Sequence, residues 1–179
     1  MLARQALLAG LLLGCATPAP TVPAPVWSLA SASPAAGNDL RLRSGGRLLT
    51  VSFQGDQVVG PRVSFLHEPG VLRGAGLELR VRGDRVIGHT NTAPVTLELE
   101  RSADAFHVRG SVGWKYVDFA LSPKTLEGRF GNCWYQLTWD GNRYDGLGGC
   151  GGTWAYLELP VALASWNDAD VASVLALLL

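Results

Sequence analysis

The chain has 179 residues, and its 15 lysines and arginines are balanced by 15 aspartates and glutamates, so that the formal net charge at pH 7 is zero. This length is enough for one domain with a substantial hydrophobic core. A balanced charge gives no indication of the strongly basic surface that is typical of nucleic-acid-binding proteins, and we therefore expect no nucleic-acid partner.

The N-terminal segment combines one positive charge with an apolar run that ends in a small residue followed by cysteine. Such a segment is typical of a secretion signal and is too short to span a membrane. Its end, Leu12-Leu13-Gly14-Cys15, resembles the lipobox of bacterial lipoproteins. The resemblance implies that residues 1–14 are removed and that Cys15 is acylated. A plain secretory peptide with a chance cysteine is the alternative.

An acylated Cys15 would make the membrane a partner through the lipid anchor and would place the protein in the bacterial cell envelope. In a diderm host, Ala16 after the cysteine resembles the class sorted to the outer membrane, facing the periplasm. The following segment, up to residue 37, contains five prolines among alanine, serine and threonine. This composition buries too little apolar surface to fold, so we expect residues 15–37 to be a tether.

From residue 38 onward the chain consists of short runs in which apolar and polar residues alternate, as in Val95-Thr96-Leu97-Glu98-Leu99. This period of two indicates antiparallel strands with one apolar face, packed over a single core. Glycine pairs and Gly-Asx pairs suit two-residue hairpin loops because glycine reaches positive φ without strain. Such pairs interrupt the runs at Gly45-Gly46, Gly55-Asp56, Gly83-Asp84, Gly131-Asn132 and Gly141-Asn142.

These patterns predict an all-β domain over residues 38–179, an antiparallel up-and-down meander of roughly ten to thirteen strands. A small barrel or a strongly coiled sheet is favoured, because both limit exposed strand edges. A membrane-spanning barrel is disfavoured, because most runs have five to eight residues and a spanning strand needs about nine to eleven.

A short C-terminal helix is predicted after Pro160, with Asn167 or Asp168 as its cap and with Asp168 and Asp170 favourable to its N-terminal dipole. We expect its apolar stripe to plug a barrel mouth or to cover a sheet edge, with a partner-binding helix as the alternative. The stripe consists of Val171, Val174, Leu175, Leu178 and Leu179.

A hairpin centred on Gly141-Asn142 is predicted to carry a disulfide between Cys133 and Cys150. If Asp140 and Arg143 close the loop, the two cysteines stand opposite each other at a distance that suits a disulfide. An acylated Cys15 would leave these two as the remaining pair in an oxidising compartment.

Candidate catalytic and metal-binding groups are few. Ser111 lacks the spacing of a nucleophile elbow. His67 and His89 are expected in loops and His107 on a polar strand face, and none has a second ligand at metal-binding spacing. We therefore expect no catalytic residue, no metal site and no cofactor, and we expect that the protein is not an enzyme.

Aromatic residues are enriched around the two cysteines. Trp134 falls on the polar face of its predicted strand, and Trp154 and Tyr156 follow in a later strand. If these three rings line one surface, they can bind a glycan, a peptide or another protein. The alternative is a second layer that covers both faces and makes the rings part of a core.

Three classes of function remain. The first is a lipid-anchored envelope protein with a non-catalytic binding or structural role, and this class is our expectation. The second is a carrier of a small apolar ligand inside a barrel, similar to lipocalins. The third is an inhibitor of a secreted hydrolase, although no loop matches the inhibitory motifs of the small β-barrel lipoproteins that inhibit lysozyme.

Overall fold

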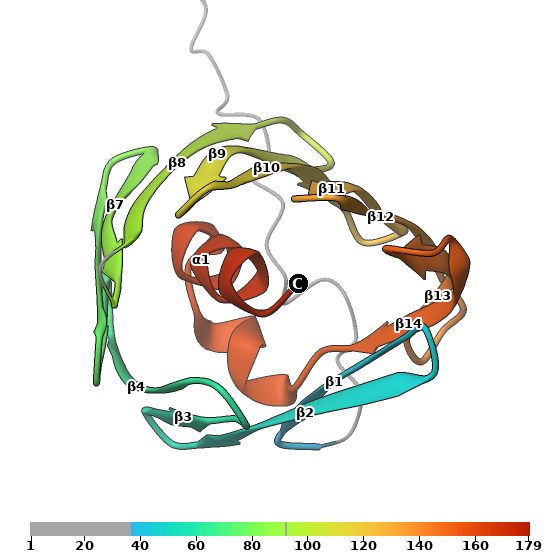
Figure 1. Cartoon of the computed structure of the whole chain (residues 1–179), viewed down its shortest axis with the longest axis horizontal. Coiled ribbons are helices and arrows are strands. Elements are labelled where there is room, and N and C mark those ends of the chain that lie inside the picture. The colour runs from blue at the N-terminus through green and yellow to red at the C-terminus, as the bar shows by residue number, and fades with distance from the viewer. Residues whose placement is uncertain (1–36, 92) are drawn as a thin grey trace, which may run out of the picture.

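A computed structural model describes residues 37–91 and 93–179. The predicted signal peptide, Cys15 and the tether as far as residue 36 lie outside the described residues. Fourteen strands form a closed antiparallel barrel, in which each strand pairs with the next and β14 pairs with β1. Helix α1 (Asp168–Leu178) lies in the centre of this barrel (Figure 1). The predicted all-β meander with a C-terminal helix is confirmed, and its closure makes it a barrel.

The number of strands exceeds the predicted ten to thirteen, because β3 and β5 have only three and four residues and are too short to show a clear alternation. The strands are β1 (Asp39–Ser44), β2 (Arg47–Gln54), β3 (Gln57–Val59), β4 (Ser64–Glu68), β5 (Val71–Gly74), β6 (Leu77–Arg82), β7 (Arg85–Thr90), β8 (Ala93–Arg101), β9 (Phe106–Val112), β10 (Lys115–Leu121), β11 (Thr125–Phe130), β12 (Cys133–Trp139), β13 (Tyr144–Gly149) and β14 (Thr153–Glu158).

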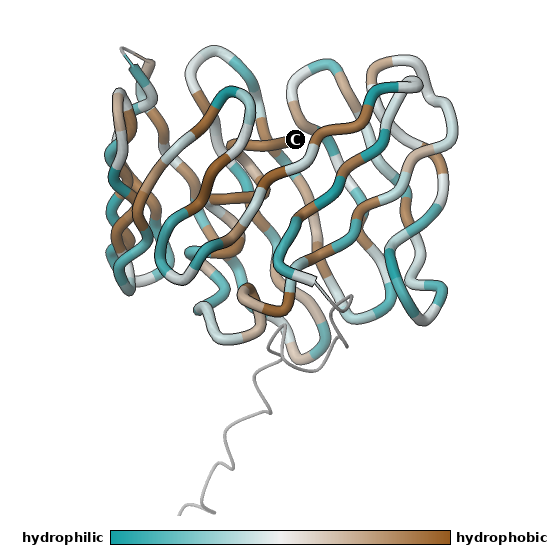
Figure 2. Tube along the Cα trace, turned by 90° about the horizontal axis from the view of Figure 1, so that it is seen from below, coloured by the Kyte–Doolittle hydropathy of each residue, from teal (hydrophilic) through white to brown (hydrophobic). Residues whose placement is uncertain are grey.

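The strands alternate as the sequence predicts. In β8, Val95, Leu97 and Leu99 point into the barrel and are buried, whereas Glu98 is exposed and pairs with Arg85 on the outer face at 2.8 Å. The same alternation of hydrophobic and hydrophilic residues is visible along the other strands (Figure 2). The wall is thus apolar inside and polar outside, which is the reverse of a transmembrane barrel.

The hairpin of β12 and β13 has the predicted register. Its loop is closed by the backbone N–H of Asp140, which donates to the carbonyl of Arg143 at 3.0 Å. Cys133 and Cys150 form a disulfide at the other end of the hairpin. The expected cross-strand pairs are observed between Trp139 and Tyr144, Leu137 and Gly146, and Tyr135 and Gly148.

Every odd-numbered strand from β5 to β13 contains a glycine that the neighbouring backbone approaches closely. A Cβ atom on Gly110 would lie 2.0 Å from the carbonyl oxygen of Thr96, and one on Gly128 would lie 2.3 Å from that of Asp118. Such glycines let a strand bend sharply enough to close a barrel. The set consists of Gly74, Gly88, Gly110, Gly128 and Gly146.

Helix α1 lies inside the lumen of the barrel, and it therefore neither covers a sheet edge nor sits only at the mouth. Its first nine residues, from Asp168 to Ala176, are all buried, because the barrel wall surrounds the helix on every side. The helix contacts β6, β7 and β9, and small residues such as Ala172 allow this close approach. A 3₁₀ helix, η2 (Val161–Ser165), leads the chain from β14 to α1.

Aromatic rings fill the lumen beside the helix. Phe106, Phe119, Phe130 and Tyr135 project from four successive strands, and the Phe119 and Phe130 rings stack with centroids 4.7 Å apart. The Phe130 ring meets that of Tyr135 edge-on at 5.6 Å.

In residues 37–91 and 93–179, no helix has the length and apolar composition needed to cross a lipid bilayer.

Replacing Gly128 by alanine is expected to destabilise the barrel by on the order of 2 kcal/mol or more, because the new Cβ would collide with the backbone of β10. Gly151→Ala is the matched control, since the nearest atom to its Cβ would be the Thr153 methyl at 4.0 Å. Urea unfolding of both variants checks this. Equal free energies of unfolding would show that the glycine is not required for closure.

Replacing both Cys133 and Cys150 by serine is expected to lower the free energy of unfolding by about 3 kcal/mol, because the 17-residue separation then closes no loop in the unfolded chain. Thermal melts of the oxidised protein and of the double variant measure the loss. An unchanged melting temperature, together with two titratable thiols in the unmodified protein, would contradict the disulfide.

Candidate functional site

The two ends of the barrel differ. One end, which we call the mouth, carries the β1–β2, β9–β10 and β11–β12 turns and the β3–β4 loop, and the C-terminal residues of α1 reach it. The opposite, closed end carries the β4–β5 turn, against which the N-terminal turn of α1 packs through Asp170 and Gly70. The helix therefore runs from the closed end towards the mouth.

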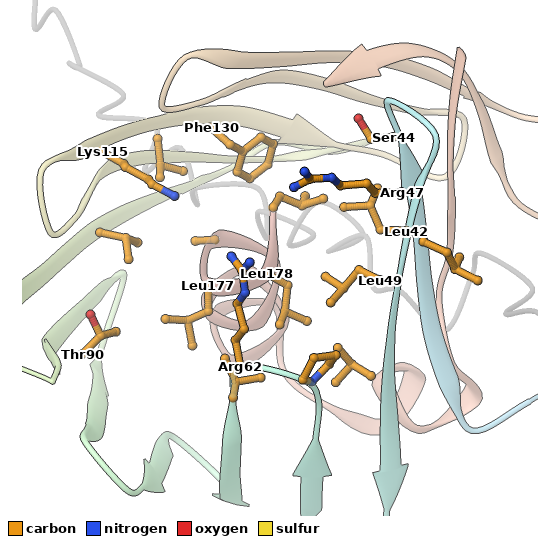
Figure 3. A pocket seen from close by; sticks show the side chains of 18 residues that line it. Leu42, Ser44, Arg47, Leu49, Arg62, Thr90, Lys115, Phe130, Leu177 and Leu178 are labelled. Carbon is orange, nitrogen blue, oxygen red and sulfur yellow. The ribbon is translucent and has the colours of Figure 1, made fainter. Parts of the chain in front are cut away.

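A cavity of about 590 Å³ opens at the mouth between the end of α1 and the walls formed by β1, β2, β10 and β11 (Figure 3). This volume lies within the range of about 300 to 1,000 Å³ that is usual for small-molecule sites. The lining is mainly apolar and comes from inward-facing strand residues and from the last residues of the helix. Representative members are Leu42, Leu49, Val51, Val117, Phe130 and Leu178.

Three cationic side chains surround this cavity. Arg47 is the first residue of β2, Arg62 lies in the β3–β4 loop, and Lys115 is the first residue of β10. Figure 3 shows all three projecting around the cavity above the end of α1. No acidic residue lines the cavity. Within the described residues, none of the three makes an ion pair.

The strand register explains why two of these cations face the lumen. Arg47 continues the inward-facing series of Leu49 and Val51 in β2, and Lys115 precedes the inward-facing Val117 in β10. Side chains alternate strictly along a strand. The inward-facing residue nearest the mouth in β2 and in β10 therefore points over the cavity. The cations at the mouth are thus part of the same pattern that builds the core.

The closed end shows how an inward-facing cation is usually satisfied. Arg101 is the last residue of β8 and continues the inward-facing series of Leu99. Its guanidinium donates to Asp168 at 3.2 Å and also bonds Asp84. Burial raises the pKa of the Asp168 carboxyl, and the hydrogen bond from Arg101 opposes this rise. Arg47 and Lys115 have no such acidic partner in the described chain.

A buried polar cluster fixes the N-terminal turn of α1 to the closed end. The fully buried Asp170 accepts through Oδ2 from His67 Nε2 at 2.9 Å, from the Gly70 N–H at 3.2 Å and from Asn167 Nδ2 at 2.6 Å. Its Oδ1 is buried with no hydrogen-bond partner among the described residues. The His67 ring also stacks on Trp166, with centroids 3.5 Å apart.

The structure corrects the predicted positions of two histidines and confirms the predicted cap of α1. His67 and His89 lie in strands β4 and β7 and not in loops. Asn167 is the N-cap of α1, as predicted, and its side chain accepts from the Asp170 N–H at 2.9 Å. Asp170 complements the positive end of the helix and also binds the barrel wall, 103 residues away at His67.

The predicted aromatic surface lies on the outer face of the barrel, near the disulfide. Trp134 in β12 is 39% exposed and Trp154 in β14 is 45% exposed, while Tyr156 is partly buried and lies 5.4 Å from the Trp154 ring. Leu147, which pairs with Trp154, is exposed between them on β13. No second layer formed by the described residues covers this face, so within these residues the rings are not part of a second core.

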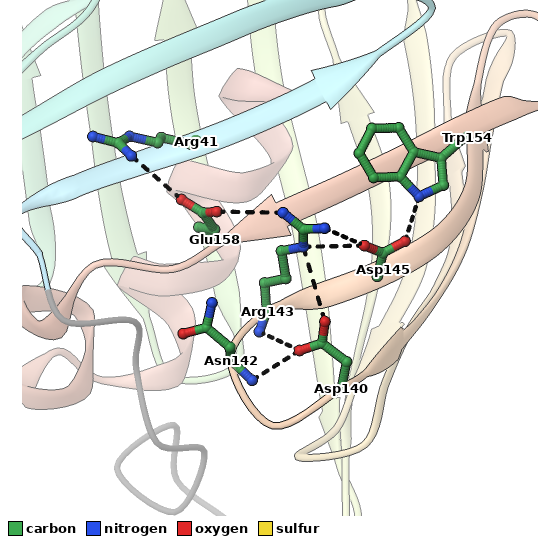
Figure 4. Close-up of polar contacts among 7 residues, drawn as sticks. All are labelled: Arg41, Asp140, Asn142, Arg143, Asp145, Trp154 and Glu158. Atoms are coloured by element: carbon green, nitrogen blue, oxygen red, sulfur yellow. Dashed lines mark hydrogen bonds and ion pairs between the residues drawn. The ribbon is translucent and has the colours of Figure 1, made fainter.

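Two of these rings are held by neighbouring charges. Arg143 lies over the Tyr156 ring at 4.4 Å and over the Trp154 ring at 5.6 Å. Trp154 Nε1 donates to Asp145 at 2.5 Å, and Arg143 donates to the same carboxylate at 2.7 Å (Figure 4). The Trp154 and Tyr156 rings are therefore held in place by the neighbouring side chains of Arg143 and Asp145.

The predicted contact between Asp140 and Arg143 is a minor one. Their charged groups are 3.9 Å apart, and Glu158 is at a similar distance of 3.8 Å, whereas Arg143 hydrogen-bonds Asp145 at 2.7 Å (Figure 4). The Asp140 carboxylate instead accepts from the backbone N–H groups of Arg143 and Asn142, and these bonds hold its pKa below the usual range. Asp140 thus shapes the turn.

The mouth was not predicted from the sequence, because Arg47, Arg62 and Lys115 come from three separate segments. The sequence nevertheless contains one indication of this site. Arg47 and Lys115 each occupy an apolar-face position at the end of an alternating run, next to a glycine turn. A polar residue at such a position marks the end of a barrel lumen, but only closure brings these ends together.

Asp170→Ala is expected to lower the free energy of unfolding by about 2–4 kcal/mol, because His67 and the Gly70 N–H would lose a buried acceptor. Asp104→Ala removes an exposed aspartate that bonds only Ser102 and should change stability by less than about 0.5 kcal/mol. Urea unfolding compares the two variants. A similarly small loss for both would show that the cluster does not hold the helix.

Comparison of this chain with protein-family models, with curated proteins and with solved structures gives no match. The mouth and the outer aromatic face are therefore the two features from which a function can be argued.

Proposed function

We propose that this protein is a lipid-anchored, non-catalytic binding protein of the bacterial cell envelope, and that the cavity at the mouth takes a small apolar ligand. The observation that carries the proposal is the apolar cavity of about 590 Å³ at an otherwise filled barrel. Open, mostly apolar hollows with a few polar groups are the usual form of small-molecule sites.

The filled lumen limits where such a ligand can lie. In a lipocalin-like carrier the ligand would occupy the centre of the barrel, but here α1 and a row of aromatic rings occupy that space. The remaining apolar surface lies between the helix end and the strands on the far side from β6, β7 and β9, which the helix contacts. The ligand is therefore expected at the mouth and not in the lumen.

The position of the mouth is compatible with a lipid anchor. Strand β1 begins at the closed end, where Asp39 pairs with Ser52 near the β2–β3 turn. An anchor that precedes β1 in the chain would join the barrel at this end and would leave the mouth open to the surrounding solution.

The outer aromatic face is the second candidate site. Trp134, Leu147 and Trp154 expose 39%, 50% and 45% of their surface, and together they form an apolar patch on the wall. A glycan or protein partner could stack on these rings. The mouth is preferred because the Trp154 and Tyr156 rings already contact Arg143 and Asp145.

Leu49→Trp is expected to weaken binding of the neutral apolar probe N-phenyl-1-naphthylamine by at least tenfold, because the larger side chain would occupy the cavity. Leu147→Trp, on the outer face, is the matched control. Both are measured by probe fluorescence in the full chain carrying Cys15→Ala, which prevents acylation and avoids detergent. Weaker binding only in Leu147→Trp would move the site to the aromatic face.

Cys15→Ala alone is expected to release the protein from the membrane fraction and to abolish labelling by radioactive palmitate, because the acylated thiol would be absent. Cell fractionation with Cys133→Ala as a control checks the specificity, since this variant keeps Cys15. Continued palmitate labelling of Cys15→Ala would contradict the lipid anchor.

A further inference from the structure

We infer that the ligand of the mouth is a single-chain amphiphile with an anionic head, of the fatty-acid type. This inference rests on the proposed function and adds the chemical class of the ligand. It follows from the combination of an apolar cavity with three cations and no acidic residue at its border.

Charge complementarity defines the head group. Arg47, Arg62 and Lys115 converge on one opening (Figure 3). The C-terminal end of α1 also reaches this opening. The helix end carries about half a negative charge and the α-carboxylate of Leu179, the last residue of the sequence, carries one, so that together they offset only about half of the three positive charges. Like charges that lie close together repel one another, and a bound carboxylate would relieve this repulsion through charge-assisted hydrogen bonds.

The contrast with the closed end supports the same conclusion. There, the inward-facing Arg101 meets two carboxylates of the chain itself, Asp168 and Asp84. At the mouth, the inward-facing Arg47 and Lys115 meet none among the described residues. The mouth thus has three cationic side chains and no carboxylate side chain to pair with them, and a ligand can supply a further anion.

The apolar lining defines the tail. Below the cations, the apolar surface that remains accessible comes mainly from the partly buried Leu49 of the wall and Leu177 and Leu178 of the helix, with the buried Leu42, Val117 and Phe130 behind them. A bare anion would leave this surface in contact with water, whereas an alkyl chain would bury it at a gain of about 25 cal/mol per Å². The head therefore lies at the border of the cavity and the chain against its lining.

The experiment compares laurate with monolaurin, its uncharged glycerol ester, as competitors of N-phenyl-1-naphthylamine in the full chain carrying Cys15→Ala. We expect laurate to bind on the order of tenfold more tightly than monolaurin, with a preference that weakens as salt is added. The triple variant Arg47→Gln/Arg62→Gln/Lys115→Gln should lose this preference and keep its affinity for the neutral probe and for monolaurin within about twofold.

The matched control is Arg73→Gln/Arg82→Gln/Lys124→Gln, which removes two arginines and one lysine that are exposed elsewhere on the barrel and should keep the preference. Equal binding of laurate and monolaurin, unaffected by either triple variant, would overturn the anionic head while leaving the proposed function in place. Failure of the neutral probe to bind would overturn both. If acetate or inorganic phosphate displaced the probe as effectively as laurate, the mouth would bind anions without an alkyl chain. This result would contradict an amphiphilic ligand.

Discussion

The structure depends on filling the lumen of a fourteen-stranded barrel. Small barrels are filled by the side chains of their own strands, but wider barrels enclose space that must hold a plug, a ligand or water. Here helix α1 lies in the lumen and packs with the inward-facing side chains of the strands, among them Phe119, Phe130 and Tyr135. The buried bond between Asp170 and His67 sets where along the lumen the helix begins, and so determines how much space remains at the mouth.

The two ends of the barrel follow from this placement. The helix brings acidic residues to the closed end, where Asp168 and Asp170 meet Arg101 and His67. It brings only apolar residues to the mouth, beside the cations Arg47 and Lys115. One short helix therefore neutralises one end of the barrel and leaves the other apolar and positively charged. The disulfide between Cys133 and Cys150 lies at the mouth end and restrains the strands there.

Local signals in the sequence predicted the meander, the turns and the hairpin register, because strand alternation, Gly-Asx pairs and a cysteine pair act over short distances. The glycines in the odd-numbered strands are visible in the sequence. Their role in closing the barrel becomes clear only when the backbone of the neighbouring strand lies against them, as at Gly128. Contacts through the lumen, such as that between His67 and Asp170, depend on closure and could not be predicted. The mouth was missed for the same reason, since its cations come from three separate segments.

Native mass spectrometry of the full chain carrying Cys15→Ala, expressed in the organism from which the sequence derives, tests the proposed ligand site most directly. The account predicts a protein ion with one additional mass that corresponds to a single-chain acid, released as an anion on activation and absent from Leu49→Trp. A bare protein mass, or an additional mass that Leu49→Trp retains and Trp134→Ala loses, would contradict a ligand site at the mouth.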